Sequence, residues 1–441
     1  VGVISDTLSG SGQRARLINS ISNKGTVIGI YAVGGIVGAV LSAQGLDQNP
    51  SIDTCQAVDP SFSETDSQGY IGGAVGFLGF NRQVENIVVS ALTSDITIYS
   101  KWSTAAYTSP VEPNCLTFGG GGIVGINFGF MDSVSVDGSM KINLSGAISG
   151  GVAGINGGTI TDSTVTVGLR TDRRRVGSAW RSGTFGGHVG YNRADSSIIG
   201  AVTNYVPATY GTVFAENSAA YTIYTEVGTA TWADNFNIEI PVAPDPKTNP
   251  VIGDDPGSDT ANLYLGGIVG YNRGIIISHY EDETLIRATS YNGKLLVSRR
   301  SNGTSSNYSY IGLIVGYNET SSNILDTATS INAKIEYYRY NFVGVKGYNL
   351  TAPYTYMYDF LGGLIGGRTG SGQATIPSVY TATAYARYEA NGNGPADHDP
   401  VSGGFWGQSG ATNFPVSRID LTNEAFTSAI ILSYDSAQVL P

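Results

Sequence analysis

The side chains that could do chemistry in this chain are few and widely spaced. Its three histidines are His188, His279 and His398, and the zinc-peptidase sequence His-Glu-x-x-His is absent. His188 stands in an apolar part of the chain, which favours a packed side chain, and His398 lies between two aspartates without a second cluster of ligands. Glu281-Asp282-Glu283 offers carboxylates of the kind that polysaccharide hydrolases use as acid and base, but no basic residue accompanies them in a matching pattern.

A further acidic group has the oxygen ligands that Ca²⁺ prefers, and consists of Asp254, Asp255 and Asp259. It lies in a stretch rich in Pro and Gly, which is typical of a plain polar loop. Neither a Gly-x-Ser-x-Gly sequence nor a phosphate-binding loop is present. We therefore predict no catalytic residue, no metal site and no cofactor, and hence a protein that is not an enzyme.

The composition excludes several classes of function. A formal net charge of −11 disfavours nucleic acid as a partner, because the phosphate backbone is itself negative. No run of about 20 apolar residues is present, so no membrane span is predicted. Charged residues make up only 13%, while Gly, Tyr, Thr, Ser, Val and Ile are abundant. This balance predicts an ordered, β-rich protein rather than a disordered one.

The elements that position these side chains come from one repeated unit. Its clearest copy is Gly266-Gly267-Ile268-Val269-Gly270-Tyr271-Asn272-Arg273-Gly274-Ile275. Paired glycines allow two backbones to approach closely or a corner to take positive φ, and x-Asn-x-Gly is typical of a turn. Apolar and polar residues then alternate with the period of a strand. Copies begin at Gly34, Gly72, Gly121, Gly150, Gly186, Gly266, Gly312, Gly362 and Gly403.

These repeats predict an all-β fold, a β-solenoid or β-helix of about nine Gly-rich repeats with inserted loops. The copies at 121 and 150 are 29 residues apart and those at 186 and 266 are 80 apart, whereas propeller blades are more uniform. Uneven spacing suits a solenoid, because its insertions fall in loops. The expected organisation is an N-terminal rung at 1–33, a repeat domain at 34–425 with a large insertion at about 200–262, polar loops at 41–70 and 100–118, and a C-terminal strand or assembly tail at 426–441.

The repeat Gly-Gly-Ile-Val-Gly-x-Asn-x-Gly-x-Ile resembles the GLUG motif, which occurs in bacterial surface proteins, in adhesins and in the stalks of some secreted peptidases. It is similar, more distantly, to the Gly-Gly-Ala/Ile repeats of polymorphic outer-membrane adhesins, which are β-helical. The copies span about residues 25–415. The resemblance implies a β-solenoid with an extracellular or cell-surface location, and it transfers no catalytic residue.

The asparagine of the repeat is predicted to form an internal ladder. A buried amide must be satisfied, so we expect each one to bond to backbone groups of the adjacent rungs. The first two and last two copies depart from the pattern, with Val40, Leu78, Arg368 and Ser409 at this position. The five ladder residues are Asn127, Asn156, Asn192, Asn272 and Asn318.

Two further predictions follow from an extracellular location. Cys55 and Cys115 lie in long segments between repeats, and are either buried free thiols or, as we predict, one disulfide that ties two loops on the same side of the solenoid. Asn302 and Asn307, in the Ser-rich loop 301–309, are the expected glycosylation sites. The remaining sequons are at Asn143 and Asn349, which are further candidates, and at Asn318, where a glycan would compete with the ladder.

The C-terminal stretch predicts assembly. Its apolar, β-prone residues follow the last repeat and have no Gly-Gly sequence of their own; they are Phe426, Ile430, Ile431, Leu432 and Tyr434. Such a segment is a candidate for strand addition to a neighbouring molecule, and contacts that do not close give a filament. We predict a head-to-tail homopolymer in which this segment packs on the next subunit's N-terminal rungs. The alternative is that it folds back as a cap on its own chain.

The predicted function is therefore that of a non-enzymatic extracellular structural protein, a subunit of a surface filament or an adhesin. Tyr-rich stretches such as 354–358 either cover the sheet as stacked aromatic ladders or form an adhesive face for matrix or host-surface glycans. The alternative function is that of a β-helical polysaccharide-acting enzyme or a carbohydrate-binding module. A carboxylate pair on one concave face would favour this alternative.

Overall fold

Every regular element in the described part of this computed structural model is a β-strand, which confirms the predicted all-β class there. The described residues are 2–5, 17–28, 31–41, 50–62, 69–99, 119–145, 148–172, 175–176, 179–180, 183–194, 196–204, 221–226, 263–301, 307–319, 323–324, 327–329, 334–341, 357–362, 365–368, 380–388, 401–403, 406–409 and 426–434.

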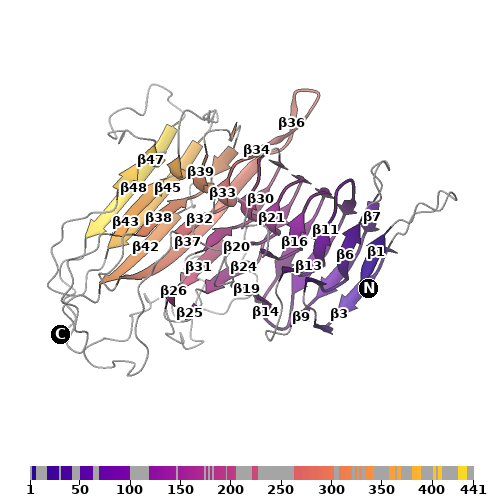
Figure 1. Ribbon diagram of the computed structural model, residues 1–441. Helices are drawn as coiled ribbons and strands as arrows, with labels where there is room; N and C mark the ends of the chain where they lie inside the picture. The colour runs from indigo at the N-terminus through magenta and orange to yellow at the C-terminus, as the bar shows by residue number, and fades with distance from the viewer. Residues whose placement is uncertain are drawn as a thin grey trace.

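Four large sheets hold most of these strands, and the paired strands within each sheet run parallel (Figure 1). The ten-stranded sheet contains, in order, β1 (Val3–Ser5), β6 (Val37–Leu41), β11 (Val75–Leu78), β16 (Val124–Asn127), β21 (Ala153–Asn156), β28 (Val189–Asn192), β33 (Val269–Asn272), β39 (Val315–Asn318), β44 (Ile365–Arg368) and β47 (Trp406–Ser409). The nine-stranded sheet contains β5 (Ala32–Gly34), β10 (Tyr70–Gly72), β15 (Gly119–Gly121), β20 (Ile148–Gly150), β27 (Thr184–Gly186), β32 (Leu263–Gly266), β38 (Asn307–Gly312), β43 (Met357–Gly362) and β46 (Val401–Gly403).

The eight-stranded sheet follows the same order along the chain, whereas the thirteen-stranded sheet consists of two runs of strands that meet at β37. The eight-stranded sheet contains β2 (Leu17–Ile18), β7 (Pro50–Asp53), β12 (Gln83–Glu85), β17 (Phe130–Asp132), β22 (Thr159–Thr161), β29 (Ser197–Ile199), β34 (Ile275–Ile277) and β40 (Asn323–Ile324). The thirteen-stranded sheet contains β14 (Ile96–Tyr99), β19 (Lys141–Ser145), β24 (Gly168–Asp172), β31 (Tyr221–Glu226), β37 (Thr289–Ser301), β30 (Val202–Asn204), β23 (Thr164–Val165), β18 (Ser135–Gly138), β13 (Val88–Ala91), β8 (Gln56–Val58) and β3 (Ile21–Asn23), with β41 (Thr327–Thr329) and β42 (Lys334–Asn341) also paired to β37.

Four strand pairs stand apart from the large sheets. Two are antiparallel: β25 (Arg175–Val176) with β26 (Ala179–Trp180), and β35 (His279–Glu281) with β36 (Thr284–Arg287). Two are parallel: β4 (Thr26–Val27) with β9 (Ser61–Phe62), and β45 (Tyr380–Tyr388) with β48 (Phe426–Tyr434).

The chain visits the large sheets in a repeating order. In the circuit that contains β15 to β19, it passes from the nine-stranded sheet to the ten-stranded, the eight-stranded and then the thirteen-stranded sheet. The next circuit, β20 to β24, lays a parallel strand beside each of these in the same register. In Figure 1 the strands are accordingly layered from the indigo N-terminal end to the yellow C-terminal end.

The paired glycines stand where each circuit turns from the nine-stranded into the ten-stranded sheet. Every one of the nine strands in the nine-stranded sheet ends on the first glycine of one sequence copy. A Cβ on Gly122 would lie 1.9 Å from the carbonyl oxygen of Gly151 in the next circuit. A Cβ on Gly125 would lie 2.6 Å from the backbone nitrogen of Ile71 in the nine-stranded sheet. Close backbone approach, rather than positive φ, therefore requires glycine at these positions.

A left-handed turn recurs between the eight-stranded and thirteen-stranded sheets. Thr54, Asn86 and Ser133 have φ of 53°, 52° and 51° at equivalent corners. Their backbone N–H groups each donate to the corresponding carbonyl of the following circuit, so the corners stack. None of the five ladder asparagines has positive φ, whereas Asn81, between β11 and β12, has φ of 55°.

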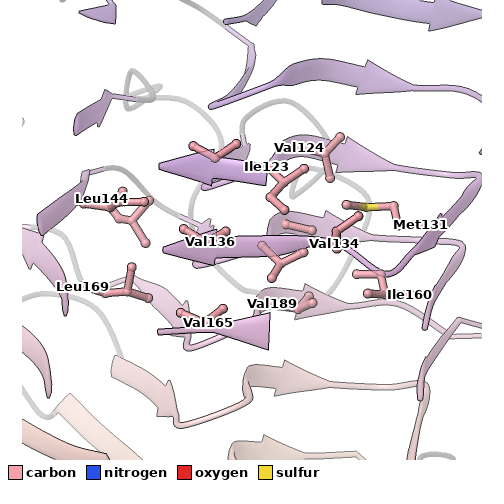
Figure 2. Packing of buried hydrophobic residues seen from close by; sticks show 14 of the residues in the cluster. Ile123, Val124, Met131, Val134, Val136, Leu144, Ile160, Val165, Leu169 and Val189 are labelled. Carbon is pink, nitrogen blue, oxygen red and sulfur yellow. The ribbon is translucent and has the colours of Figure 1, made fainter. Parts of the chain in front are cut away.

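One hydrophobic core runs through the successive circuits. Val124, Met131 and Val136 come from three different sheets of one circuit, and all are buried. Figure 2 shows them together with equivalent side chains of the neighbouring circuits, such as Ile160 and Val165. Strand alternation explains this core, because every second residue of each short strand points inward.

Two predicted loops contain strands. Residues 50–62 form β7, β8 and β9, so the prediction of a polar loop over 41–70 is wrong for this part. Within the predicted insertion at about 200–262, β30 and β31 lie in the thirteen-stranded sheet, and β31 pairs with β24 and β37. The predicted loop at 100–118 lies outside the described residues.

Candidate functional site

The five predicted asparagines lie in one continuous row of buried amides. Each ends a strand of the ten-stranded sheet, and the parallel register aligns them. The Nδ2 of Asn127 donates to the Oδ1 of Asn156 over 2.7 Å, and Asn156 donates to Asn192 over 2.9 Å. Asn192 donates to Asn272, and Asn272 donates to Asn318, over 2.7 Å each. All four hydrogen bonds therefore run in the same direction along the layered strands.

Three of the amides, those of Asn127, Asn156 and Asn272, also bond to the backbone of their own turn. The N–H of Gly274 donates to the Oδ1 of Asn272, and the Nδ2 of Asn272 donates to the carbonyl of Gly274, over 3.2 Å each. Asn156 and Gly158 make the same two bonds over 3.2 and 3.3 Å. The predicted bond to the backbone of the adjacent circuit is also present. It runs from the Nδ2 of Asn156 to the carbonyl oxygen of Ser197 over 3.3 Å. Amide-to-amide bonding between circuits, which the sequence did not predict, is the shorter interaction.

Apolar and basic residues flank the row. Leu78 is in register with Asn127 and is fully buried, while Arg368 is in register with Asn318. Leucine therefore fits at this position of a circuit, and the row consists of asparagines for their hydrogen bonds rather than for their volume.

A second buried cluster is built from aromatic and aliphatic side chains of the nine-stranded and ten-stranded sheets. The rings of Tyr264 and Tyr310 stack with centroids 5.4 Å apart, and Tyr271 meets Tyr264 edge-on at 5.1 Å. The hydroxyl of Tyr271 donates to Glu319, which also pairs with Arg273 at 2.7 Å. Burial, aided by Glu319, raises the pKa of Tyr271 well above its ordinary value. These tyrosines form stacked ladders that fill the structure rather than an exposed face.

The predicted Tyr-rich face at 354–358 lies largely beyond the described residues. Residues 354–356 are outside them, and residues 357–358 belong to β43.

His188 is packed in the interior, as its apolar surroundings in the sequence predicted. Its Nδ1 lies 2.9 Å from the hydroxyl oxygen of Ser163, and both side chains are fully buried. Burial, with a smaller effect from the charge of Arg287, lowers the pKa of His188 from 6.5 to about 3. The imidazole is therefore neutral at pH 7, and this Ser–His pair offers no exposed surface to a substrate.

The β35–β36 hairpin projects from the corner where the other circuits make a tight turn (Figure 1). Its two-residue turn consists of Asp282 and Glu283, with φ of 45° and 63°. At its base, the Nδ1 of His279 lies 3.0 Å from a carboxylate oxygen of Asp162 in an earlier circuit. The candidate carboxylates at 281–283 thus lie on an exposed tip, not on a concave face.

No group of three or more histidine, cysteine or acidic side chains suited to a metal ion occurs in the described ranges. The sequence candidates Asp254, Asp255, Asp259 and His398 fall outside those ranges.

Cys55 is a free thiol between β7 and β8, and it is 1% exposed. Its Sγ donates to the carbonyl of Asp53 at 3.3 Å and accepts from the N–H of Ser20 at 3.4 Å. The predicted disulfide from Cys55 to a loop is therefore corrected, because the side chain turns into the core instead of lying in a polar loop. Cys115, the predicted partner, lies outside the described residues.

The glycosylation candidates differ in their secondary structure and in their exposure. Asn143 is a half-buried residue of β19, and Asn307 is the first residue of β38 rather than a member of a loop. Asn318 is 1% exposed within the amide row, where no glycan fits without breaking the row. Asn302 and Asn349 lie outside the described residues.

The C-terminal segment pairs within its own chain. β48 contains all five predicted assembly residues: Phe426, Ile430, Ile431, Leu432 and Tyr434. It pairs in parallel with β45 over the whole range from Tyr380–Phe426 to Tyr388–Tyr434. This pairing corresponds to the alternative, in which the segment folds back onto its own chain, while donation of the segment to a next subunit stays a prediction.

Exposed apolar side chains gather at two places that the sequence did not indicate. Of the twelve large hydrophobic residues found exposed in the described part of the chain, six lie between Val3 and Leu41, at the N-terminal end of the layered strands. Four lie between Ile275 and Ile286, at and beside the protruding hairpin. Apolar–polar alternation in the sequence does not reveal which face of a strand lacks a neighbour, so it gave no signal for these two places.

Comparisons with protein-family models, with curated proteins and with solved structures give no match for this chain. In the part of the chain that is described, no helix has the length and apolar character needed to cross a bilayer.

Proposed function

We propose that this chain is a β-solenoid of about nine Gly-rich circuits and serves as a non-enzymatic structural protein outside the cell or at its surface. It is a subunit of a filament or an adhesin, and its copies assemble head to tail. The observation that carries this proposal is the in-register layering of the circuits, in which nine strands end on nine repeat glycines. A chain built this way grows by adding layers, and each layer contacts only its neighbours.

The internal bonding suits a protein that resists extension. Backbone hydrogen bonds between parallel strands run along the layered direction, and the amide row from Asn127 to Asn318 runs along it too. In the circuits from β15 to β24, a force applied along that direction is shared by the bonds of four sheets. This arrangement favours a load-bearing rod over a protein whose function needs one circuit to open.

The described side chains give little support to an enzymatic role. His188 and Ser163 are buried inside the core, and the carboxylates at 281–283 lie on an exposed hairpin tip. General acid–base catalysis needs two groups that both reach one substrate, and neither set meets this condition.

Electron microscopy of the purified 441-residue chain over a range of concentrations tests the proposal, together with sedimentation velocity. We expect fibres whose subunits repeat along the fibre axis, with larger species as the concentration rises. A chain that sediments as a monomer at the highest attainable concentration would contradict the proposed assembly.

Glycan binding is a second candidate function, supported by one exposed aromatic group. Phe80 is 63% exposed and stacks on Phe128 with ring centroids 4.9 Å apart, and the guanidinium of Arg193 lies 5.3 Å from the centroid of Phe128. A flat apolar ring beside a cation suits the mixed polar and apolar faces of a sugar. Glycan-array binding that is lost in Phe80→Ala and kept in Leu92→Ala would support an adhesin, and equal binding by both variants would refute this site.

A further inference from the structure

We infer that the β35–β36 hairpin of one copy binds the β25–β26 pair of a second copy and so joins copies side by side. The hairpin carries exposed apolar side chains next to an acidic tip, and the β25–β26 pair lies in the most basic stretch of the sequence. The inference goes beyond the proposed head-to-tail assembly, because it concerns the sides of the layered sheets rather than their ends.

The hairpin exposes large apolar side chains. Leu285 and Ile286 are each 50% exposed, and Tyr280 is 40% exposed. Tyr280 is in register with Leu285 across the hairpin, and Ile286 lies at the register shift beside this pair. Ile275, in the strand that leads into the hairpin, is also 40% exposed. Apolar side chains that gather on one projecting element indicate a protein contact rather than a solvated loop.

The base of the hairpin is fixed to an earlier circuit, so the apolar surface is in place before binding. The Nδ1 of His279 in β35 lies 3.0 Å from a carboxylate oxygen of Asp162. Arg287 in β36 donates to the carbonyl oxygen of Asp162 over 3.3 Å and also to the hydroxyl of Thr164. Both strands are therefore held, and a surface that is held in this way loses little conformational entropy when a partner docks on it.

The tip of the hairpin adds negative charge to this surface. Glu281, Asp282 and Glu283 are all exposed, and they form the longest run of acidic residues in the sequence. A partner that covers the neighbouring apolar side chains also removes water from these carboxylates. Because carboxylates that lose water need an opposite charge, the surface favours a basic partner.

A second copy of the chain offers a surface of this chemistry. Arg173-Arg174-Arg175 is the longest run of basic residues in the sequence, and its last member begins β25. Arg175 is in register with Trp180 of β26, and Val176 with Ala179. Arginine binds carboxylates through paired hydrogen bonds, and arginine and tryptophan are both enriched at protein contacts. The β25–β26 pair thus combines apolar residues with the charge that the hairpin tip requires.

The two elements leave different sides of the layered strands, so they meet between copies and not within one. The hairpin lies between β34 of the eight-stranded sheet and β37 of the thirteen-stranded sheet, whereas the β25–β26 pair lies between β24 and β27. In Figure 1, β36 projects at the top of the layered strands and β25 and β26 lie at the bottom. Such a contact joins two different surfaces, so each copy can bind two neighbours and a row of copies results.

An exchange of charges tests the contact in the full chain. The hairpin variant carries Glu281→Arg, Asp282→Arg and Glu283→Arg. The complementary variant carries Arg173→Glu, Arg174→Glu and Arg175→Glu. Sedimentation velocity at about 0.02 M salt, where surface charges are little screened, measures their association. We expect either variant alone to raise the dissociation constant at least about tenfold, which corresponds to about 1.4 kcal/mol. An equal mixture should recover the wild-type association, because each reversed element then meets its complement on the other variant.

A matched control makes the same change in net charge on another surface. Its three half-buried carboxylates lie in register on the eight-stranded sheet, and it should associate like the wild type; it carries Asp53→Arg, Glu85→Arg and Asp132→Arg.

A milder hairpin variant, Asp282→Asn with Glu283→Gly, keeps the test valid if the arginines impair folding. These two turn residues have φ of 45° and 63°, a geometry that Asn-Gly prefers. The melting temperature should therefore not fall, while association weakens. A tip with only a structural role would leave association unchanged in this variant.

The outcomes separate the inference from the proposed function. If the wild type does not associate side by side at low salt, or if folded hairpin variants associate like the wild type, the inference is wrong. If each variant loses association and the mixture does not recover it, the hairpin tip and the β25–β26 pair do not bind each other. Fibres without side-by-side packing in electron micrographs would support the proposed function and refute the inference. Salt-sensitive pairs without fibres would support the inference and refute the head-to-tail assembly.

Discussion

Replacing Asn272 by leucine is expected to lower the free energy of unfolding by interrupting the amide row near its middle. Asn272 accepts from Asn192 and donates to Asn318, over 2.7 Å each, and exchanges two further bonds with Gly274. The substitution leaves the Nδ2 of Asn192, the Oδ1 of Asn318 and the N–H of Gly274 without these partners in a buried region.

The expected loss follows from the number of stranded groups. A buried polar group that loses its partner costs about 1–3 kcal/mol, so three such groups give about 3–9 kcal/mol. Burial of the leucine side chain offsets roughly 1.5–3 kcal/mol of this. The net expectation is therefore a loss of about 1.5–6 kcal/mol. Steric strain contributes little, because Leu78 already occupies the same row in an earlier circuit and is fully buried.

Asn127→Leu is the matched control, because Asn127 begins the row. It donates to Asn156 and accepts from the N–H of Gly129, so its loss strands two groups instead of three. We expect a smaller loss, of about 1–3 kcal/mol.

Urea unfolding followed by circular dichroism measures both losses, with hydrogen exchange of the Gly274 amide as a local readout. Equal stability of Asn272→Leu and the wild type would refute the row as a stabilising element. A loss at Asn127 as large as that at Asn272 would show that the effect is one of volume rather than of hydrogen bonds.

Three further predictions concern single positions. Burial lowers the pKa of His188 in the folded chain to about 3 from its ordinary value of 6.5. Between these two pH values the unfolded chain binds one proton more than the folded chain. The free energy of unfolding is therefore at its full value above pH 6.5 and falls by about 1.4 kcal/mol per pH unit below it. In urea titrations between pH 7 and pH 4, His188→Gln should lose this part of the pH dependence of stability. His279→Gln, at a partly exposed site, should keep it. An unchanged slope of stability against pH in His188→Gln would show that His188 is not the group responsible. Gly122→Ala should prevent folding or lower the melting temperature strongly, because its Cβ meets a carbonyl oxygen, whereas Gly2→Ala, with open space around it, should melt like the wild type. Cys55 should react with a maleimide in denaturant without reductant but not in the folded chain, and a blocked thiol in denaturant would restore the disulfide hypothesis.

Local sequence was sufficient for the strands and for the turn that each asparagine holds. Apolar–polar alternation needs only a few neighbouring residues, and it predicted the strands that flank the repeat glycines. The bond between the N–H of Gly274 and the side chain of Asn272 spans two residues, so the x-Asn-x-Gly pattern also determines it locally. The first glycines of the nine copies, eight of which are Gly-Gly pairs, marked every turn from the nine-stranded into the ten-stranded sheet.

Contacts between circuits decided the rest. The amide row depends on register between residues as far apart as Asn192 and Asn272, and no local pattern reports whether one amide will face another or a backbone group. Cys55 stands in a stretch that looks polar, and only the pairing of β7 and β8 with their neighbours turns its thiol inward. The same limit hid the exposed apolar side chains between Val3 and Leu41. An isoleucine such as Ile21 has the same intrinsic strand preference whether or not another layer covers it, so its exposure is a property of the assembled sheets alone.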